Sequence, residues 1–248
     1  MAEMAAKNSI FLGRKALIVG GSGGIGKAIA LELAKHGAEL IIHGGSSNER
    51  LQNTLKTIRE DGGKAEGFLL KIDSPKAAEE IYARSAPFNI LICAYGPFRQ
   101  GVLENLDMEF WQNMVENNLI FPGILVSLAL KDMINENWGR ILLFGGTNTD
   151  NIKGFTTTAA YSAAKTGLGV IAKSAAKAAG SMGVSCNVLC PGLTETEYTG
   201  EGLKQYYREK CPGGKAMNPG ELARTALSIL ENPCINGAII PADKGLVL

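Results

Sequence analysis

Short apolar runs alternate with segments of helical period along most of the chain. Segments such as 26–37 and 48–63 have the spacing of amphipathic helices, and glycines end the second of them. Seven apolar runs are predicted to be strands: 15–20, 38–44, 65–73, 88–96, 139–146, 184–192 and 237–245. Regular alternation of strand and helix predicts an α/β fold, with a parallel sheet covered by helices on both faces. Because no linker or change in composition divides the chain, residues 1–248 are predicted to form a single domain.

The composition excludes several classes of partner. The 248 residues are 46% hydrophobic and 20% charged, with a formal net charge of +1. This balance gives no electrostatic reason to expect nucleic acid or an anionic membrane as partner. No apolar run approaches the roughly 18 residues of a membrane span, and the first residues lack the core of a signal peptide. We therefore expect a cytoplasmic protein with no membrane partner.

Cysteine and histidine give no sign of a metal or disulfide framework. The five cysteines are scattered and odd in number, which argues against disulfides. Cys186 and Cys190 lie in one strand-like run, where they would be too far apart to share a metal. With only two histidines in the chain, zinc would have almost no ligands. No metal site is expected.

A glycine-rich loop follows the first predicted strand directly. Residues 20–26 read GGSGGIG and open a helical segment. Glycines let the backbone approach a pyrophosphate, and a helix N-terminus adds N–H groups and a positive dipole. In this strand–loop–helix context, the loop predicts a dinucleotide site.

The spacing G-x-x-x-G-x-G of Gly20, Gly24 and Gly26 resembles the short-chain dehydrogenase/reductase family, and the resemblance covers nearly all of the chain. It implies a Rossmann-type, doubly wound sheet and a nicotinamide cofactor. Val19 stands where that family usually has threonine, which would remove one local hydrogen bond. CPGLTET resembles the family's P-G-x-x-x-T, and Asp73 matches the position that meets the adenine. The implied cofactor contacts are Gly20, Ser22, Gly24, Ile25, Gly26, Asp73, Gly96, Pro191, Gly192 and Thr196.

Tyr161 and Lys165 lie four residues apart in YSAAK, a spacing that puts them on one helical face and also arises by chance. Their place after the fifth predicted strand resembles the family's Y-x-x-x-K. This implies that Tyr161 gives a proton to a substrate carbonyl oxygen while the cofactor delivers hydride to carbon. Lys165 would lower the pKa of the phenol and grip the nicotinamide ribose. Asn118 resembles the asparagine that extends the proton relay, or makes only a local helix bond.

The loop after the second predicted strand bears on the choice of cofactor. An acid ending this strand usually recognises a ribose without the 2′-phosphate, but Gly44 and Gly45 stand there. A 2′-phosphate could be held by residues of the range 43–50. The alternative is a polar loop that caps the next helix. We favour NADP(H) over NAD(H), with these candidate contacts: His43, Ser46, Ser47 and Arg50.

Two segments depart from the family's pattern. The family usually has a catalytic serine after the fifth strand, yet the stretch 128–161 contains no serine. Gly146 falls in the expected slot, so Thr147 could supply the hydroxyl, or Asn148 or Thr149 after a shift. In the fourth strand, N-N-A-G is replaced by CAYG, residues 93–96, whose tyrosine would either line the pocket or simply pack.

The segment 197–217 lies where the family places its substrate lid. Its aromatic and basic residues would receive an acyl carrier or anionic substrate, or would form a solvated helix face. These residues are Lys204, Tyr206, Tyr207, Arg208 and Lys210.

The function predicted from this resemblance is NADPH-dependent reduction of a carbonyl, a ketone or a 3-oxoacyl thioester, to an alcohol. One alternative is a nucleotide-binding scaffold or sensor whose chemistry has decayed; another is a divergent enoyl reductase. A homo-oligomer, tetramer or dimer, is expected from the family, although no residue demonstrates it.

Overall fold

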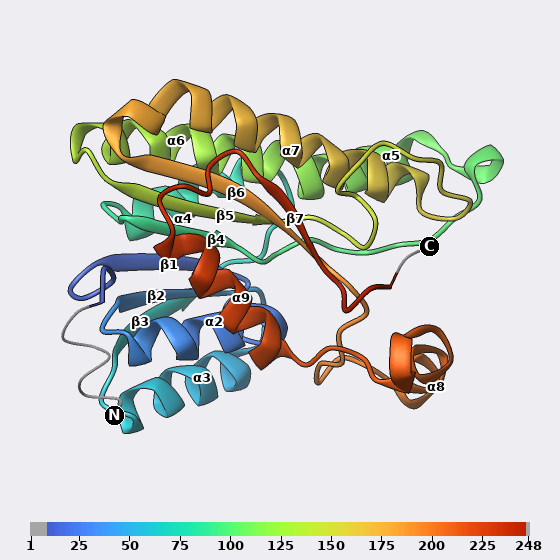
Figure 1. Cartoon of the computed structure of the whole chain (residues 1–248), viewed down its shortest axis with the longest axis horizontal. Helices are drawn as coiled ribbons and strands as arrows, with labels where there is room; N and C mark the ends of the chain where they lie inside the picture. Colours follow the sequence, from blue (N-terminus) through green and yellow to red (C-terminus); the bar gives the residue numbers. More distant parts are fainter. Residues whose placement is uncertain (1–8, 247–248) are drawn as a thin grey trace.

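The computed structural model describes residues 9–246 and contains one sheet of parallel strands (Figure 1). The strand order is β3-β2-β1-β4-β5-β6-β7. The strands are β1 (Lys15–Val19), β2 (Glu39–Gly44), β3 (Lys64–Leu69), β4 (Ile90–Cys93), β5 (Gly139–Phe144), β6 (Val184–Pro191) and β7 (Ile239–Ala242). All seven predicted strands are present, and the doubly wound fold is confirmed. The order reverses between β1 and β4, and the crevice at such a reversal is where doubly wound sheets bind ligands.

Helices cover both faces of the sheet, in two layers that Figure 1 shows above and below the strands. One layer holds α2 (Gly24–Lys35), α3 (Asn48–Glu60) and α9 (Pro219–Glu231). The other holds α4 (Ala77–Ser85), α5 (Met108–Val115), α6 (Phe121–Asn135) and α7 (Ala159–Ala179). Alternate residues of β1 enter opposite cores, with Leu17 in one and Ile18 in the other. Burial on both faces explains why the strands read as continuous apolar runs.

The shorter elements join these layers. They are the 3₁₀ turns η1 (Leu103–Asn105), η3 (Gly180–Met182) and η4 (Pro212–Gly214), and the π turn η2 (Glu116–Ile120). Helix α8 (Glu201–Lys210) belongs to neither layer and has no buried residue. Figure 1 shows α8 set apart from both layers, beyond the carboxyl end of β6, on the segment predicted to form a lid.

Helices α5, η2 and α6 run on as one helical stretch, Met108–Asn135. By length and composition alone this stretch could cross a membrane, so the expectation that no segment approaches a span does not hold for it. Core helices pass the same test, and α6 buries Phe121, Leu125 and Met133 against the sheet. One apolar face of this helical stretch thus packs in the core, and its other apolar side chains line a groove that is described below.

Candidate active site

The glycine loop lies where β1 and β4 diverge. The amide of Ala94 donates to the carbonyl of Val19 at 3.0 Å, and a Cβ on Gly20 would lie 3.2 Å from the Ala94 backbone. A Cβ on Gly26 would overlap the carbonyl oxygen of Gly20. Gly20 and Gly24 also have φ of +79° and +54°, a region that side chains rarely adopt. Close backbone packing thus requires Gly20 and Gly26, and the positive φ requires Gly24; the loop ends at the N-terminus of α2.

Tyr161, Lys165 and Asn118 meet beside Gly96. Lys165 is 4% exposed, and its Nζ donates to the carbonyl of Phe144 at 2.9 Å. The same Nζ lies 5.7 Å from the centroid of the Tyr161 ring. A Cβ on Gly96 would lie 2.5 Å from Asn118 Oδ1 and 2.7 Å from Lys165 Nζ. Three separate segments of the chain therefore converge, because α7, η2 and the end of β4 meet at the same edge of the sheet.

The π turn η2 places Asn118 in this cluster. Asn118 is fully buried, and its Nδ2 donates to the carbonyl of Pro97 at 3.0 Å. Its Oδ1 has no hydrogen-bond partner among the described residues. A buried acceptor without a partner is costly, and this one faces the same space as Lys165 Nζ. The site therefore fits a bound group or water that would donate to Oδ1.

Burial dominates the acid–base character of the pair. It raises the pKa of Tyr161 above the ordinary value, and the nearby Cys190 thiol acts in the same direction. Burial lowers the pKa of Lys165 to about 8. In the chain by itself, desolvation outweighs any attraction between the two groups, so the lowering of the phenol's pKa by Lys165 stays a prediction for the site with its cofactor bound. Burial therefore keeps Tyr161 protonated in the chain without cofactor.

The sequence model of the short chain dehydrogenase family matches residues 14–206. The chain belongs to this family. As a short-chain dehydrogenase, the protein is an oxidoreductase, and the resemblance seen in its motifs is confirmed.

Relatives at full length share the family but differ in activity. The 3-oxoacyl-(acyl-carrier-protein) reductase FabG of Aquifex aeolicus is 32% identical over 247 residues, covering 94% of this chain and 97% of its own. The 2-dehydro-3-deoxy-D-gluconate 5-dehydrogenase of Formosa agariphila is 26% identical, covering 95% and 93%. A 3-oxoacyl (acyl-carrier-protein) reductase from Agrobacterium tumefaciens, solved with NADP bound, superposes with a TM-score of 0.87 at 27% identity, over 95% of each chain.

In this short-chain dehydrogenase, Gly146 faces Tyr161. A Cβ on Gly146 would lie 2.8 Å from Cε1 and 3.2 Å from the hydroxyl of Tyr161. The hydroxyl of Thr147 donates to the carbonyl of Pro191 at 3.0 Å, so its hydrogen is already used. Thr149 is buried, and its hydroxyl bonds the amide and carbonyl of Gly146 at 2.8 and 3.0 Å. Neither threonine offers a free hydrogen for a substrate carbonyl.

Asn148 occupies the turn between these threonines. Its φ is +62°, and the amide of Thr149 donates to the carbonyl of Gly146 at 3.2 Å to close the turn. Asparagine tolerates this left-handed conformation better than most residues. Position in the turn therefore accounts for asparagine here.

His43 contacts the first residue of the glycine loop. It is buried, its Nε2 lies 2.8 Å from the carbonyl of Leu70, and the amide of Gly20 lies 3.4 Å from its Nδ1. These partners assign the proton to Nε2. Burial lowers the pKa of His43, which keeps the ring neutral. The structure places His43 between two strand ends, and its contact with a cofactor phosphate stays a prediction.

The other residues of the 43–50 loop divide between two roles. Ser47 caps α3 by accepting from the amide of Arg50 at 3.3 Å, as the capping alternative predicts. Ser46 is exposed beside it. A Cβ on Gly44 would lie 3.2 Å from the hydroxyl of Ser22, so no larger residue fits there without a shift. Ser22 and Ser46 remain available to an anion, while the guanidinium of Arg50 lies over the ring of Tyr198.

The segment after β6 carries the remaining predicted cofactor contacts. A Cβ on Gly192 would lie 2.7 Å from Cα of Asp243, so this glycine is required by close packing. The hydroxyl of Thr196 accepts from the amide of Tyr198 at 3.3 Å. Asp73 is exposed just beyond β3, and Ile25 lies in the first turn of α2. The predicted contacts after β3 and β6 thus follow the carboxyl ends of their strands, as the glycine loop follows β1.

Tyr95 packs and does not line the pocket. Its hydroxyl lies 3.3 Å from Asn117 Oδ1 and 3.5 Å from the carbonyl of Ile72. Its ring meets Phe121 edge to face, with centroids 5.8 Å apart. The alternative left open by the sequence is thereby decided in favour of packing, since both ends of the side chain have partners in the core.

Phe98 is a site residue that the sequence did not indicate. Its ring meets Tyr161 edge to face, with centroids 5.0 Å apart, yet the side chain is 56% exposed. A lone phenylalanine in a loop carries no periodic or motif signal. Phe98 gives Tyr161 an apolar neighbour that is open to solvent.

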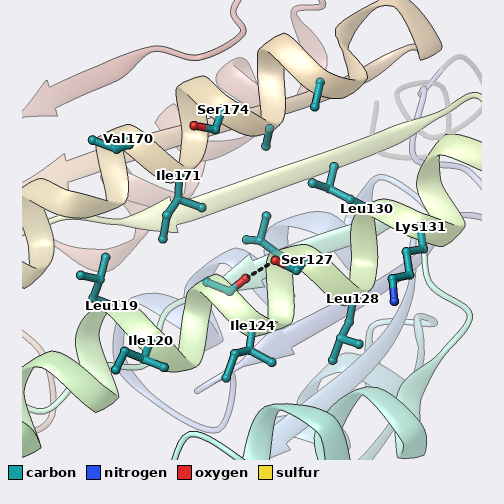
Figure 2. A pocket seen from close by; sticks show the side chains of 14 residues that line it. Leu119, Ile120, Ile124, Ser127, Leu128, Leu130, Lys131, Val170, Ile171 and Ser174 are labelled. Carbon is teal, nitrogen blue, oxygen red and sulfur yellow. Dashed lines mark hydrogen bonds between the residues drawn. The ribbon is translucent and has the colours of Figure 1, made fainter.

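A groove of ≈ 670 Å³ lies away from this chemistry. Figure 2 shows it between α6 and α7, lined by apolar side chains such as Ile120, Ile124, Val170 and Ile171. Both helices turn their other faces to the sheet. Among residues 9–246, no group of three or more His, Cys, Asp or Glu side chains could hold a metal ion.

Proposed function

We propose that this short-chain dehydrogenase is an NADPH-dependent carbonyl reductase whose substrates are 3-oxoacyl thioesters. The observation that carries the proposal is the convergence of Tyr161, Lys165 and Asn118 beside Gly96. The relatedness to 3-oxoacyl-(acyl-carrier-protein) reductases along the whole chain supports the substrate class. The apolar, exposed ring of Phe98 against Tyr161 suits an acyl chain better than a sugar acid.

The residues present fit a nicotinamide dinucleotide. The close packing of Gly20 on Ala94 and of Gly26 on Gly20 fixes the loop at the N-terminus of α2, where its N–H groups would bind a pyrophosphate. Ser22, Ser46 and Arg50 would hold a 2′-phosphate, and no acid ends β2 to compete for a 2′-hydroxyl. The bound nicotinamide would supply the hydride. The NADP-bound relative supports the choice of NADP(H).

The chain's own residues handle the proton. Tyr161 keeps its proton because burial raises its pKa, and it gives this proton to the carbonyl oxygen as negative charge develops there. Lys165, with a pKa of about 8, is mostly cationic at neutral pH and stabilises the phenolate left behind. The unpaired Oδ1 of Asn118 orients a water that can return a proton to this pair.

The empty hydroxyl slot at Gly146 favours one other candidate, a nucleotide-binding scaffold with decayed chemistry. The decisive experiment measures NADPH consumption against 3-oxoacyl thioesters, diketones and quinones, with Tyr161→Phe alongside. We expect reduction of a 3-oxoacyl thioester to its 3-hydroxy product. Tyr161→Phe should lose about a hundredfold or more of that rate and bind NADPH unchanged. Tight NADPH binding without turnover of any substrate would support the scaffold instead.

We also propose that the protein is a homo-oligomer that associates through the groove between α6 and α7. The apolar side chains there include Val170, which is 69% exposed, and Ile120 (Figure 2). Gly123 and Ser127 lie between them and allow a second helix pair to approach closely. Exposed apolar surface of this kind marks interaction sites in soluble proteins.

A further inference from the structure

The N-terminus of α2 is closed by the chain's own carboxylate. Glu197 Oε1 accepts from the amide of Gly24, the first residue of α2, at 2.8 Å. The same oxygen would lie 2.6 Å from a Cβ on Gly23, so it sits directly against the loop backbone. No side chain of α2 caps this end. Glu197 therefore occupies the place where the glycine loop presents its N–H groups to an anion.

Tyr198 covers the neighbouring part of the same site. A Cβ on Gly23 would overlap its hydroxyl, and one on Gly24 would lie 3.4 Å from its ring. The guanidinium of Arg50 lies 5.0 Å from the ring centroid of Tyr198, on the side of the loop after β2. Glu197 and Tyr198 together thus engage both places that an NADP phosphate would use, the helix N-terminus and Arg50.

A tight turn holds these two side chains in position. The amide of Tyr198 donates to the hydroxyl of Thr196 at 3.3 Å, and the amide of Thr196 donates to the hydroxyl of Thr199 at 2.9 Å. The amide of Thr199 donates to the carbonyl of Thr196 at 3.0 Å. The turn begins at the fifth residue after β6 and ends two residues before the start of α8, so it joins the sheet to the predicted lid.

We infer that Glu197 and Tyr198 form a latch over the dinucleotide site, which a cofactor must displace in order to bind. The inference rests on the proposed cofactor function. A carboxylate at a helix N-terminus is stabilised by the same N–H groups and dipole as a phosphate. The two anions cannot share Gly24, so the closed latch reduces the apparent affinity for the cofactor by the fraction of molecules that are open. Opening also frees Arg50 for the 2′-phosphate and moves the connection to α8.

The test compares the NADPH dissociation constants of the wild-type protein and of three full-length variants, measured by NADPH fluorescence. Glu197→Gln removes the charge of the latch, and Tyr198→Ala removes its contacts with Gly23 and Arg50 without changing net charge. Glu195→Gln is the matched control, because Glu195 lies in the same segment but faces Lys204 at 3.7 Å. All three side chains are exposed, so the fold should survive, which thermal unfolding checks.

We expect Glu197→Gln and Tyr198→Ala each to bind NADPH on the order of two- to fivefold more tightly, the range of one exposed charge–dipole contact. Glu195→Gln should match the wild type. Unchanged or weaker binding in both latch variants would overturn the latch and leave the proposed function standing. An equal gain in NADPH affinity in Glu195→Gln would also overturn the latch, because the change in net charge would then explain the effect. Failure of all four proteins to bind NADPH would overturn the latch and the proposed function together.

Discussion

Gly146 lies against Tyr161 so closely that a Cβ on the glycine would be 2.8 Å from the ring and 3.2 Å from the hydroxyl. A side chain at this position would therefore point at Tyr161, and the family's pattern has a serine there. The protein keeps the geometry of that slot and lacks its hydroxyl.

Replacing Gly146 by serine and by alanine separates the effect of an added hydroxyl on catalysis from the effect of an added Cβ on stability. Both variants place a Cβ against Tyr161 and should lose stability by about 1–3 kcal/mol through overpacking. Only the serine can donate to a substrate carbonyl, so its kcat/KM should exceed that of the alanine variant by about tenfold or more. Steady-state kinetics and chemical unfolding measure the two effects. Equal kcat/KM in the two variants would show that a hydroxyl in this slot adds nothing to catalysis.

Thr147→Ala tests whether Thr147 supplies the missing donor. Because its hydroxyl donates to the carbonyl of Pro191, we expect the variant to lose about 1 kcal/mol of stability and to bind NADPH less tightly. Thr147→Ser keeps the hydroxyl and should restore both. A loss in kcat of a hundredfold with unchanged NADPH binding would instead assign the donor role to Thr147.

Arg50→Gln tests the choice of cofactor. If Arg50 binds the 2′-phosphate, its loss should weaken NADPH binding roughly ten- to a hundredfold, since hydrogen bonds to charged groups contribute about 1.5–3 kcal/mol. NADH binding should not weaken. Lys56→Gln, which removes a cation from the exposed face of the same helix, is the control for net charge. Wild-type protein that binds NADPH and NADH equally would contradict the assignment of this loop.

His43 makes stability depend on pH. Burial lowers its pKa in the folded protein below that of the unfolded chain, near 6.5, so its contribution is fully present above pH 6.5. As pH falls below 6.5, that contribution is lost by up to about 1.4 kcal/mol per pH unit, until the folded pKa is reached. Urea unfolding between pH 8 and 5 should show this slope in wild type and in His36→Gln, and a shallower one in His43→Gln. The same slope in His43→Gln would remove His43 as its source.

Val170→Glu tests the association through α6 and α7. A charge in the apolar groove should convert the wild-type oligomer to smaller species in light scattering, with the fold retained. Ile152→Glu is the matched control, because Ile152 is 92% exposed and does not line the groove. A monomeric wild type, or an oligomer unaffected by Val170→Glu, would rule out this interface.

The sequence by itself determined the seven strands, the doubly wound sheet and the glycine loop. Strands that are buried on both faces appear in the sequence as continuous apolar runs, and a loop without room for Cβ atoms appears as a run of glycines. Both patterns are local, so they can be recognised from the sequence alone. The pair Tyr161 and Lys165 is also visible in the sequence, because one helix carries both residues.

Only the tertiary structure decided where single side chains point. His43 contacts the carbonyl of Leu70, and Thr147 donates to the carbonyl of Pro191. Tyr95 packs in the core with its hydroxyl near the carbonyl of Ile72. Each of these partners comes from a segment distant in the chain. The ring contact of Phe98 with Tyr161 and the hydrogen bond from Gly24 to Glu197 could not be predicted from the sequence for the same reason. A hydrogen bond or ring contact between distant segments depends on angstrom-scale packing, which neither periodicity nor motif spacing encodes.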